Sequence, residues 1–209
     1  MGPRDAYDRV AQEYAKRIDD ELIHKPFDRD LLDRIAADLP RDGWVIDLGA
    51  GPGQVGAYLA GRGARVVAVD LSAAMLVEAE RLHPELHAIQ ADMRRLPFGD
   101  ATLAGVVAFY SLIHIEPPEV LPALRDIARV LRPGAPAVIA VHIGEAFRHM
   151  DEWWGHEVSL DFHFFDPDAL AGAVAAAGLE IVDALQRDPY PDGVEADTRR
   201  VYIVARKPD

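Results

Sequence analysis

One segment, Val45 to Gly56, most constrains the fold that this chain can adopt. Its sequence, VIDLGAGPGQVG, is an apolar run containing Asp47 that continues into a turn with glycine at every second position. The apolar-rich residues 55–60 that follow predict a helix. A strand, a glycine-rich turn and a helix in this order are typical of the first crossover of an α/β nucleotide-binding domain. Glycine permits positive φ angles and close approach of a ligand to the main chain.

The glycines of this turn satisfy two different patterns. Gly51, Gly53 and Gly56 match the GxGxxG pattern of dinucleotide-binding domains. Asp47 followed by glycines at 49, 51 and 53 matches a second pattern, in which an acid comes two residues before the first glycine. A tight turn that binds nothing also accommodates these glycines, so the choice depends on residues further along the chain.

Composition limits the class of protein. The 209 residues suit one α/β domain, and half of them are hydrophobic, which is enough for a substantial core. Cysteine is absent from the sequence, which excludes disulfides and thiolate zinc sites. The net charge of −13 argues against a nucleic-acid partner, because such binding needs a basic face. No apolar run is long enough to span a bilayer and the first residues show no apolar signal region, so we expect a cytoplasmic protein without a membrane partner.

Predicted strands alternate with predicted helices through most of the chain. Strands are expected at 44–48, 65–69, 86–89, 102–110 and 137–141, and helices at 28–39, 73–82, 117–131 and from Asp166 or Asp168 to 177. This alternation predicts a doubly wound, mainly parallel sheet. Two more strands, 179–184 and 201–205, are joined by a segment too short and too polar for a crossover helix. They are expected to form a C-terminal antiparallel hairpin, giving an α/β fold with a seven-stranded sheet.

Two segments lie outside this alternation. Residues 4–20 place apolar and tyrosine side chains, including Tyr7 and Tyr14, on one face of a helix. This helix either packs on the domain or acts as a lid whose tyrosines reach a ligand. Residues 144–165 are rich in His, Trp and Phe, and their apolar residues do not recur at a regular spacing. We interpret them as an inserted cap or loop. A second domain is not expected, so 1–209 is one domain.

Three acids lie at the ends of three neighbouring predicted strands. Asp70 ends the second strand, where a carboxylate accepts hydrogen bonds from both ribose hydroxyls of an adenosine. Asp92 follows the third strand, where it is placed to accept from an adenine amine while Met93 covers the ring. Asp47 distinguishes the ligands, because an acid in this turn repels a pyrophosphate and attracts an ammonium group. The ligand implied is an adenosine with a cationic amino-acid tail, which describes S-adenosylmethionine.

The ordered motifs resemble those of the class I S-adenosylmethionine-dependent methyltransferases, in particular the small-molecule, single-domain branch. The resemblance covers about residues 40–142. It rests on VIDLGAGPG at 45–53, VDLS at 69–72 with Met75, ADM at 91–93, LPF at 96–98, SLIH at 111–114 and LRPG at 131–134. The implied fold is the Rossmann-like methyltransferase fold, and the implied cofactor is S-adenosylmethionine, with S-adenosylhomocysteine as product.

The resemblance also implies roles for individual residues. Gly49, Gly51 and Gly53 would line the methionine part of the cofactor and Asp47 would act on its amino group. The remaining implied cofactor contacts are Asp70 at the ribose, Leu71, Asp92 and Met93 around the adenine, Phe109 near the sulfonium, and Met75. Tyr14 resembles a lid tyrosine, which favours residues 1–40 as an N-terminal helical lid.

Catalysis and acceptor binding are less constrained by the sequence. His142 ends the fifth strand and His114 follows the fourth, so either is a candidate base, although each also suits a structural role. Trp153, Trp154 and His163 are candidates for an acceptor pocket, or they pack the inserted segment on the sheet. Histidines 149, 156 and 163 lack ligand-like spacing, so no metal is expected.

The sequence therefore predicts a methyltransferase with a small-molecule acceptor of undetermined identity and methylated atom. Two alternatives stay open: an NAD-dependent oxidoreductase, and a non-catalytic protein that binds an adenosyl ligand. Oligomeric state is not predicted.

Overall fold

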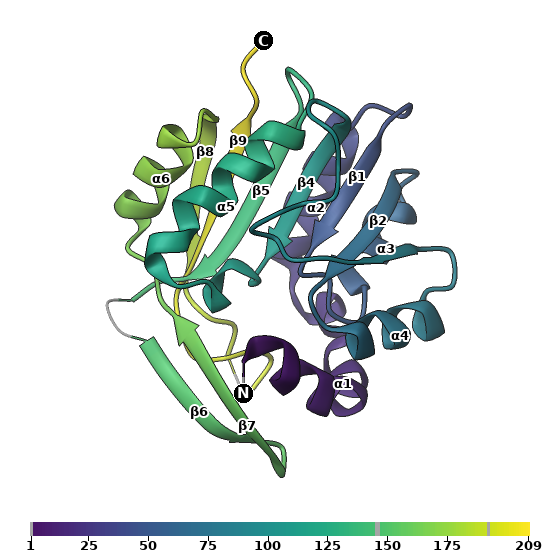
Figure 1. Cartoon of the computed structure of the whole chain (residues 1–209), viewed down its shortest axis with the longest axis vertical. Coiled ribbons are helices and arrows are strands. Elements are labelled where there is room, and N and C mark those ends of the chain that lie inside the picture. Colours follow the sequence, from purple (N-terminus) through teal and green to yellow (C-terminus); the bar gives the residue numbers. More distant parts are fainter. Residues whose placement is uncertain (1, 145–146, 192) are drawn as a thin grey trace.

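Seven strands form one sheet in the order β3-β2-β1-β4-β5-β9-β8 in the computed structural model, which describes residues 2–144, 147–191 and 193–209 (Figure 1). The first five strands pair in parallel, and β9 runs antiparallel to both β5 and β8. The strands are β1 Trp44–Leu48, β2 Arg65–Asp70, β3 His87–Gln90, β4 Leu103–Phe109, β5 Pro136–His142, β8 Glu180–Arg187 and β9 Arg200–Arg206. The predicted parallel sheet with a closing antiparallel hairpin is confirmed.

Helices cover both faces of this sheet and bury its apolar side chains. The helices are α2 Pro26–Asp38, α3 Gln54–Ala60, α4 Ala73–Leu82, α5 Pro117–Val130 and α6 Pro167–Ala176. The apolar side chains of α5 and α6 pack in one core cluster, and those of α2 and α3 pack in another. Strands β4 and β5 lie at the centre and are buried along almost their whole length, which fits their continuous apolar sequences.

Side-chain caps begin two of these helices. Ser72 precedes α4, and its Oγ accepts the backbone N–H of Met75 at 3.1 Å. Asp166 precedes α6, and its Oδ1 accepts the backbone N–H of Ala169 at 2.8 Å. A capping bond of this kind satisfies one of the unpaired N–H groups in the first turn.

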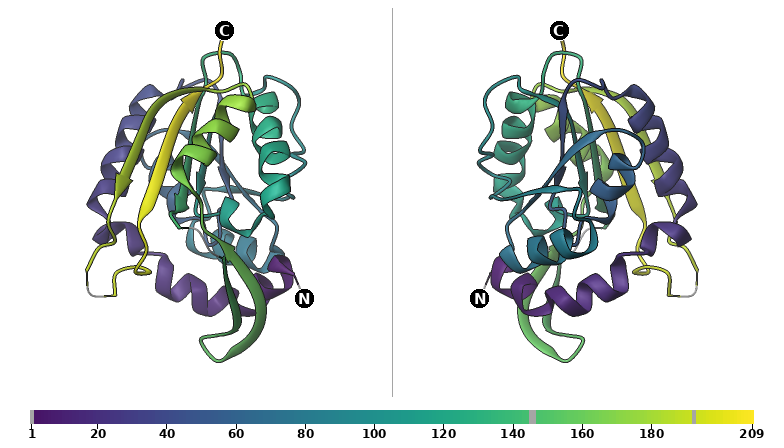
Figure 2. Two further views of the ribbon diagram at one scale, coloured as in Figure 1. Left: turned by 90° about the vertical axis from the view of Figure 1, so that its left-hand side faces the viewer. Right: turned by 90° about the vertical axis from the view of Figure 1, so that its right-hand side faces the viewer.

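The N-terminal 40 residues divide into two structurally different parts. Helix α1 (Pro3–Ile18) and the short 3-10 helix η1 (Glu21–His24) lie across the carboxyl ends of the strands, where α1 contacts α4 and β7 (Figures 1 and 2). Helix α2 instead belongs to the layer that covers the sheet. The span predicted as an N-terminal lid is therefore too long, because Leu31, Leu32 and Ile35 are core residues.

The segment predicted as an inserted cap or loop contains a β-hairpin. Strands β6 (Phe147–Trp153) and β7 (His156–His163) pair antiparallel and project from the strand ends beside α1 (Figure 2). Trp154 and Gly155 form its turn with φ angles of 52° and 81°, as two-residue hairpin turns require. Most of β6 is exposed, so alternation of apolar residues does not mark it in the sequence. Residues 145–146 of the predicted insertion lie outside the described residues.

A third, small core cluster joins the hairpin to α1 and α4. It contains Val10, Met75, Val158 and Leu160, together with two alanines of α1. No described helix combines the length and the apolar character needed to cross a membrane.

Candidate active site

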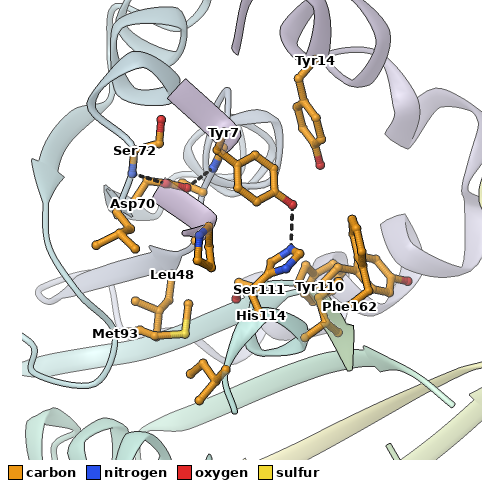
Figure 3. Close-up of a pocket in the computed structure, with 18 of the residues that line it drawn as sticks. Tyr7, Tyr14, Leu48, Asp70, Ser72, Met93, Tyr110, Ser111, His114 and Phe162 are labelled. Carbon is orange, nitrogen blue, oxygen red and sulfur yellow. Dashed lines mark hydrogen bonds between the residues drawn. The ribbon is translucent and has the colours of Figure 1, made fainter. Parts of the chain in front are cut away.

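A cavity of about 560 Å³ lies at the carboxyl ends of the parallel strands, beneath α1 and the hairpin (Figure 3). Most of the residues singled out in the sequence line this cavity. They are Tyr14, Asp47, Gly49, Gly51, Asp70, Leu71, Asp92, Met93, Phe109, His114, His142, Trp153 and His163. Gly53, Met75 and Trp154 do not line it.

The glycine turn brings main chain to the wall of this cavity. Gly49, Gly51 and Gly53 have φ angles of +72°, +54° and +90°, which explains why glycine occupies each position. A Cβ at Gly49 would lie 2.2 Å from the Cβ of Ser111, so the two turns touch here. At Gly51 the nearest atom belongs to Tyr14, 3.7 Å away, so the main chain is open toward α1.

Gly53 and Met75 support the turn from behind. A Cβ at Gly53 would lie within 3.3 Å of the side chains of Ala79, His83 and Leu86, so this glycine allows α3 to pack closely on α4 and the loop that follows it. The Met75 side chain is buried in the third core cluster with α1. The predicted direct contacts of these two residues with a cofactor are not supported by their positions.

Asp47 is a buried acid at the end of β1. Its Oδ2 accepts the backbone N–H of Gly56 at 2.8 Å, and 2% of the residue is exposed. Burial raises the pKa of Asp47 to about 7, and the nearby Asp70 adds to the increase. Among the described residues no cation forms an ion pair with this carboxylate. A positively charged ligand group is therefore the natural complement of Asp47.

Asp70 holds two loops in position at the end of β2. Its Oδ2 accepts the backbone N–H of Gly51 and its Oδ1 that of Ser72, both at 2.8 Å (Figure 3). Burial raises the pKa of Asp70 above its usual value. Each oxygen keeps a second lone pair, so this carboxylate can still accept from ligand hydroxyls. Ser72 also donates its hydroxyl to Asp8 of α1 at 2.6 Å, which ties the helix to this loop.

Asp92 has a cationic partner, which the sequence reasoning did not foresee. Its oxygens accept from the Arg94 guanidinium at 2.6 to 3.0 Å, and Arg94 also donates to Glu119 at 2.8 Å. Hydrogen bonding to Arg94 lowers the pKa of Asp92. Leu71 and Met93 line the cavity near this acid. A contact between Asp92 and an adenine amine remains a prediction.

His114 links three elements that enclose the cavity. The Asp161 carbonyl of β7 lies 2.9 Å from Nδ1 of His114, and a carbonyl only accepts, so Nδ1 carries the proton. Burial lowers the pKa of His114 to about 4, so the ring is neutral at pH 7 and Nε2 is an acceptor. Tyr7 of α1 donates its hydroxyl to Nε2 at 2.7 Å (Figure 3). The sequence placed Tyr7 on the same face of the predicted helix as Tyr14 but did not assign it to the site.

His142 lines another part of the same cavity. Its ring stacks on Tyr110 with centroids 5.0 Å apart, and Nδ1 lies 2.8 Å from Thr198 Oγ1. Within the described residues Nε2 of His142 has no hydrogen-bond partner. Burial is the largest cause that lowers the pKa of His142 to about 3, followed by the charges of Arg200 and Lys25.

Aromatic side chains form a roof over the cavity, and their contact with an acceptor remains a prediction. Trp153 packs edge-on against Tyr7, Tyr14 and Phe162 with centroids 5.5 to 5.8 Å apart. Trp154 lies behind Trp153 and beneath the Arg17 guanidinium, so it supports the roof from outside the cavity. His163 lines the cavity, with Nε2 3.7 Å from Glu116.

A buried charged cluster at one end of the cavity was missed by sequence reasoning. Lys25, Glu195 and Arg200 are 5%, 3% and 2% exposed at their side chains, and all three line the cavity. Glu195 belongs to the β8–β9 connection, which the sequence showed only as a polar segment. Its partners come from distant segments, so no local pattern could have revealed the cluster.

Two buried oxygen atoms on the cavity wall lack a hydrogen-bond partner within the described residues. These are Gln54 Oε1, in the first turn of α3, and Ser111 Oγ, beside Gly49. Unpaired buried polar atoms are costly, so their position in one cavity indicates that a ligand with donor groups completes it. Together with Asp47, they suit the ammonium group of an amino-acid tail.

The fold and this site define a class of protein: a Rossmann-like domain that binds an adenosyl cofactor at the carboxyl edge of its sheet. Residues 45–134 match the family model described as a methyltransferase domain. The chain belongs to the class I S-adenosylmethionine-dependent methyltransferases. The family's cofactor, S-adenosylmethionine, decides between the two glycine patterns in favour of the one that includes Asp47.

Individual relatives show how far this similarity extends. The chain is 38% identical to a demethylmenaquinone methyltransferase of Beutenbergia cavernae, over 46% of this chain and 39% of the relative. It is 28% identical to a malonyl-[acyl-carrier protein] O-methyltransferase of Enterobacter lignolyticus, over 91% of this chain and 74% of the relative. The chain thus spans well under half of the first of these proteins.

A solved structure resembles the chain over almost its whole length. It is the 1,6-didemethyltoxoflavin-N1-methyltransferase of Burkholderia thailandensis with bound 1,6-didemethyltoxoflavin and S-adenosylhomocysteine. The identity is 26%, the TM-score is 0.65, and the alignment covers 95% of this chain and 90% of that one.

Proposed function

We propose that this chain transfers a methyl group from S-adenosylmethionine to a small molecule bound in the same cavity. One observation carries the proposal. The buried Asp47 carboxylate, the open glycine turn, the histidines and the aromatic roof all line one cavity. A cofactor and an acceptor can therefore lie side by side within one enclosure.

The residues present fit the cofactor. Asp47 and the unpaired oxygen of Ser111 would hold the ammonium group, beside the open main chain of Gly51. Asp70 would accept from the ribose hydroxyls, and Leu71 and Met93 would flank the adenine. When bound, S-adenosylmethionine supplies an electrophilic methyl group on its sulfonium sulfur.

The chain's main contribution to such a transfer is alignment and exclusion of water. The side chains of Tyr7 and Tyr14 project from α1 into the cavity (Figure 3). The bond from Tyr7 to His114, and from His114 to the Asp161 carbonyl, joins α1, the sheet edge and the hairpin around the cavity. This arrangement supports a lid role for α1 and a cap role for residues 147–163.

His142 is the better candidate for holding the acceptor's proton. Both ring nitrogens of His114 already have partners, so its role is to hold the lid closed. Nε2 of His142 is unoccupied within the described residues and the ring lines the cavity. With its pKa at about 3, His142 is neutral at pH 7 and can accept a hydrogen bond. We infer that it takes up a proton only as methyl transfer makes the acceptor more acidic.

A small acceptor is also supported by the solved relative, whose bound 1,6-didemethyltoxoflavin is a small molecule. The test is turnover: the purified chain is incubated with S-adenosylmethionine and a library of small molecules, and S-adenosylhomocysteine release is measured. Release that depends on one acceptor supports the proposal. Tight cofactor binding without turnover on any acceptor would favour a non-catalytic binding protein.

A further inference from the structure

We propose that the cavity end formed by Lys25, Glu195 and Arg200 recognises a flat, uncharged acceptor through an oxygen atom that accepts a hydrogen bond from Lys25. This inference rests on the proposed function and names the class of acceptor. It follows from the hydrogen-bonding state of the lysine, the charge balance around it and the aromatic surface beside it.

Lys25 is a buried lysine with an incomplete set of partners. Its Nζ lies 2.5 Å from Glu21 Oε2 and 3.6 Å from Glu195 Oε2. An ammonium group carries three N–H donors, and within the described residues only Glu21 is close enough to accept a hydrogen bond. Because Lys25 lines the cavity, a ligand atom there can accept from it.

Arg200 adds a second buried cation at the same end. The residue is 1% exposed and lines the cavity. Its Nε makes no hydrogen bond within the described residues, although it lies 3.1 Å from Glu195 Oε2. Arg200 Nε is fully buried beside Glu195, so the N–H groups left for an occupant at this end are those of Lys25, and the occupant is expected to bring an acceptor atom.

The charges of the cluster are balanced, which argues against a charged occupant. Glu195 Oε1 lies 2.5 Å from the Arg187 guanidinium, which also lies 2.9 Å from Asp28 Oδ2. Three cations and three carboxylates are thus interconnected: Lys25, Arg187 and Arg200 with Glu21, Asp28 and Glu195. A carboxylate on the acceptor would lie near the like charges of Glu21 and Glu195. An ammonium group on the acceptor would lie near the like charges of Lys25 and Arg200. A neutral oxygen satisfies the free N–H groups without disturbing this balance.

Tyr110 and His142 form a fixed pair of stacked aromatic rings next to this cluster. The backbone of Tyr110 has a φ of 56°, uncommon for a residue with a bulky side chain, and its ring stacks on His142. Its hydroxyl is 2.7 Å from that of Tyr202, which donates to Asp28 at 3.0 Å. Lys25 Nζ lies 5.6 Å from the centroid of the Tyr110 ring. A flat ring beside Tyr110 and His142 would thus place an oxygen within reach of Lys25.

Binding of matched two-ring probes tests the inference. Calorimetry on the chain saturated with S-adenosylhomocysteine would compare 2-quinolone and 2-naphthol with naphthalene, naphthalene-2-carboxylate and 2-naphthylmethylamine. We expect the two neutral oxygen-bearing rings to bind at least about tenfold more tightly than the other three, as one hydrogen bond to a charged donor predicts. Tighter binding of the carboxylate or the amine, or no binding by any probe, would overturn the inference.

A double variant tests the role of Lys25 without leaving an unpaired charge. Lys25→Met with Glu21→Gln removes one charge of each sign and keeps similar side-chain volumes. We expect the preference for 2-quinolone over naphthalene to disappear, and an unchanged preference would contradict the inference. The matched control is Lys16→Met with Glu13→Gln, an ion pair of α1 that does not line the cavity and whose side chains are 70% and 30% exposed, which should keep the preference.

Failure of the proposed function and failure of the inference about the acceptor give different results in these experiments. S-adenosylhomocysteine binding reports whether each variant is folded. If the wild-type chain does not bind S-adenosylhomocysteine, the proposed function itself fails. If it binds that compound and discriminates against neutral oxygen-bearing rings, only the inference about the acceptor fails.

Discussion

The carboxylate of Asp47 accepts the backbone N–H of Gly56 at 2.8 Å, which joins the end of β1 to the first turns of α3 while the residue lines the cavity. This single bond does not offset burial, and the pKa of Asp47 is raised to about 7. An ammonium group beside Asp47 would favour its ionised form. Binding of an amino-acid tail is therefore coupled to loss of a proton from this residue.

Cofactor affinity should depend on pH through Asp47. Below pH 7 the carboxyl must lose its proton before the ammonium is bound favourably, so affinity for S-adenosylhomocysteine should fall by up to about tenfold per pH unit. Above pH 7 the affinity should level off. Calorimetry between pH 5.5 and 8.5 measures this dependence. Asp47→Asn should bind more weakly at pH 8 and lose the dependence; a persisting slope in that variant would assign the proton to another group.

The bond between Tyr7 and His114 predicts the behaviour of the lid. Tyr7→Phe removes the hydroxyl and keeps the ring packing, so we expect a loss of about 0.5–1.5 kcal/mol, or roughly 2- to 13-fold in S-adenosylhomocysteine affinity. Amide hydrogen exchange in α1 should become faster. Tyr58→Phe is the control, because Tyr58 donates to Asp33 on an exposed surface away from the cavity. Equal exchange in both variants would show that the Tyr7 bond does not hold the lid.

His142 should affect turnover and not cofactor binding. Once an acceptor is known, His142→Ala should lower kcat by about 10²-fold, at the lower end of the range for proton transfer by a side chain. Calorimetry should show unchanged affinity for S-adenosylhomocysteine. His149→Ala provides a control, because His149 lies on the hairpin with partners Asp151 and Asp161 and does not line the cavity. Normal turnover in His142→Ala would make His142 a packing residue.

Removal of Glu195 should destabilise the fold strongly. Its side chain is 3% exposed and accepts from Arg187 and from the backbone N–H of Tyr190. Glu195→Ala leaves buried cations without their carboxylate, a loss of about 3–5 kcal/mol in the free energy of unfolding. Glu119→Ala removes a 45% exposed partner of Arg94 and should cost under about 1 kcal/mol. Urea unfolding compares them, and equal losses would show that the buried cluster is not stabilising.

The sequence predicted elements that local patterns define. Strand β1 and the glycine turn have a strong signature, because positive φ angles demand glycine at 49, 51 and 53. The parallel sheet and its closing hairpin followed from element spacing and from the length of the 185–200 connection. The β6–β7 hairpin was missed because most of β6 is exposed, so its residues do not alternate.

Some residues of the candidate site were likewise predicted from local patterns in the sequence, and others were not. Asp47 and Asp70 were predicted because each lies at the carboxyl end of a strand that faces the cavity. Lys25 and Glu195 were missed because their environment is created by contacts across 170 residues of sequence. The ion pair of Asp92 with Arg94 was also missed, although the two residues are only two positions apart in the sequence.

The most direct test of the central claim is calorimetry of the purified chain with S-adenosylhomocysteine and, in parallel, with NAD. The account predicts tight binding of S-adenosylhomocysteine and none of NAD, because the buried Asp47 attracts an ammonium group and repels a pyrophosphate. Binding of NAD without binding of S-adenosylhomocysteine would contradict the account and the roles proposed here for Asp47 and Asp70.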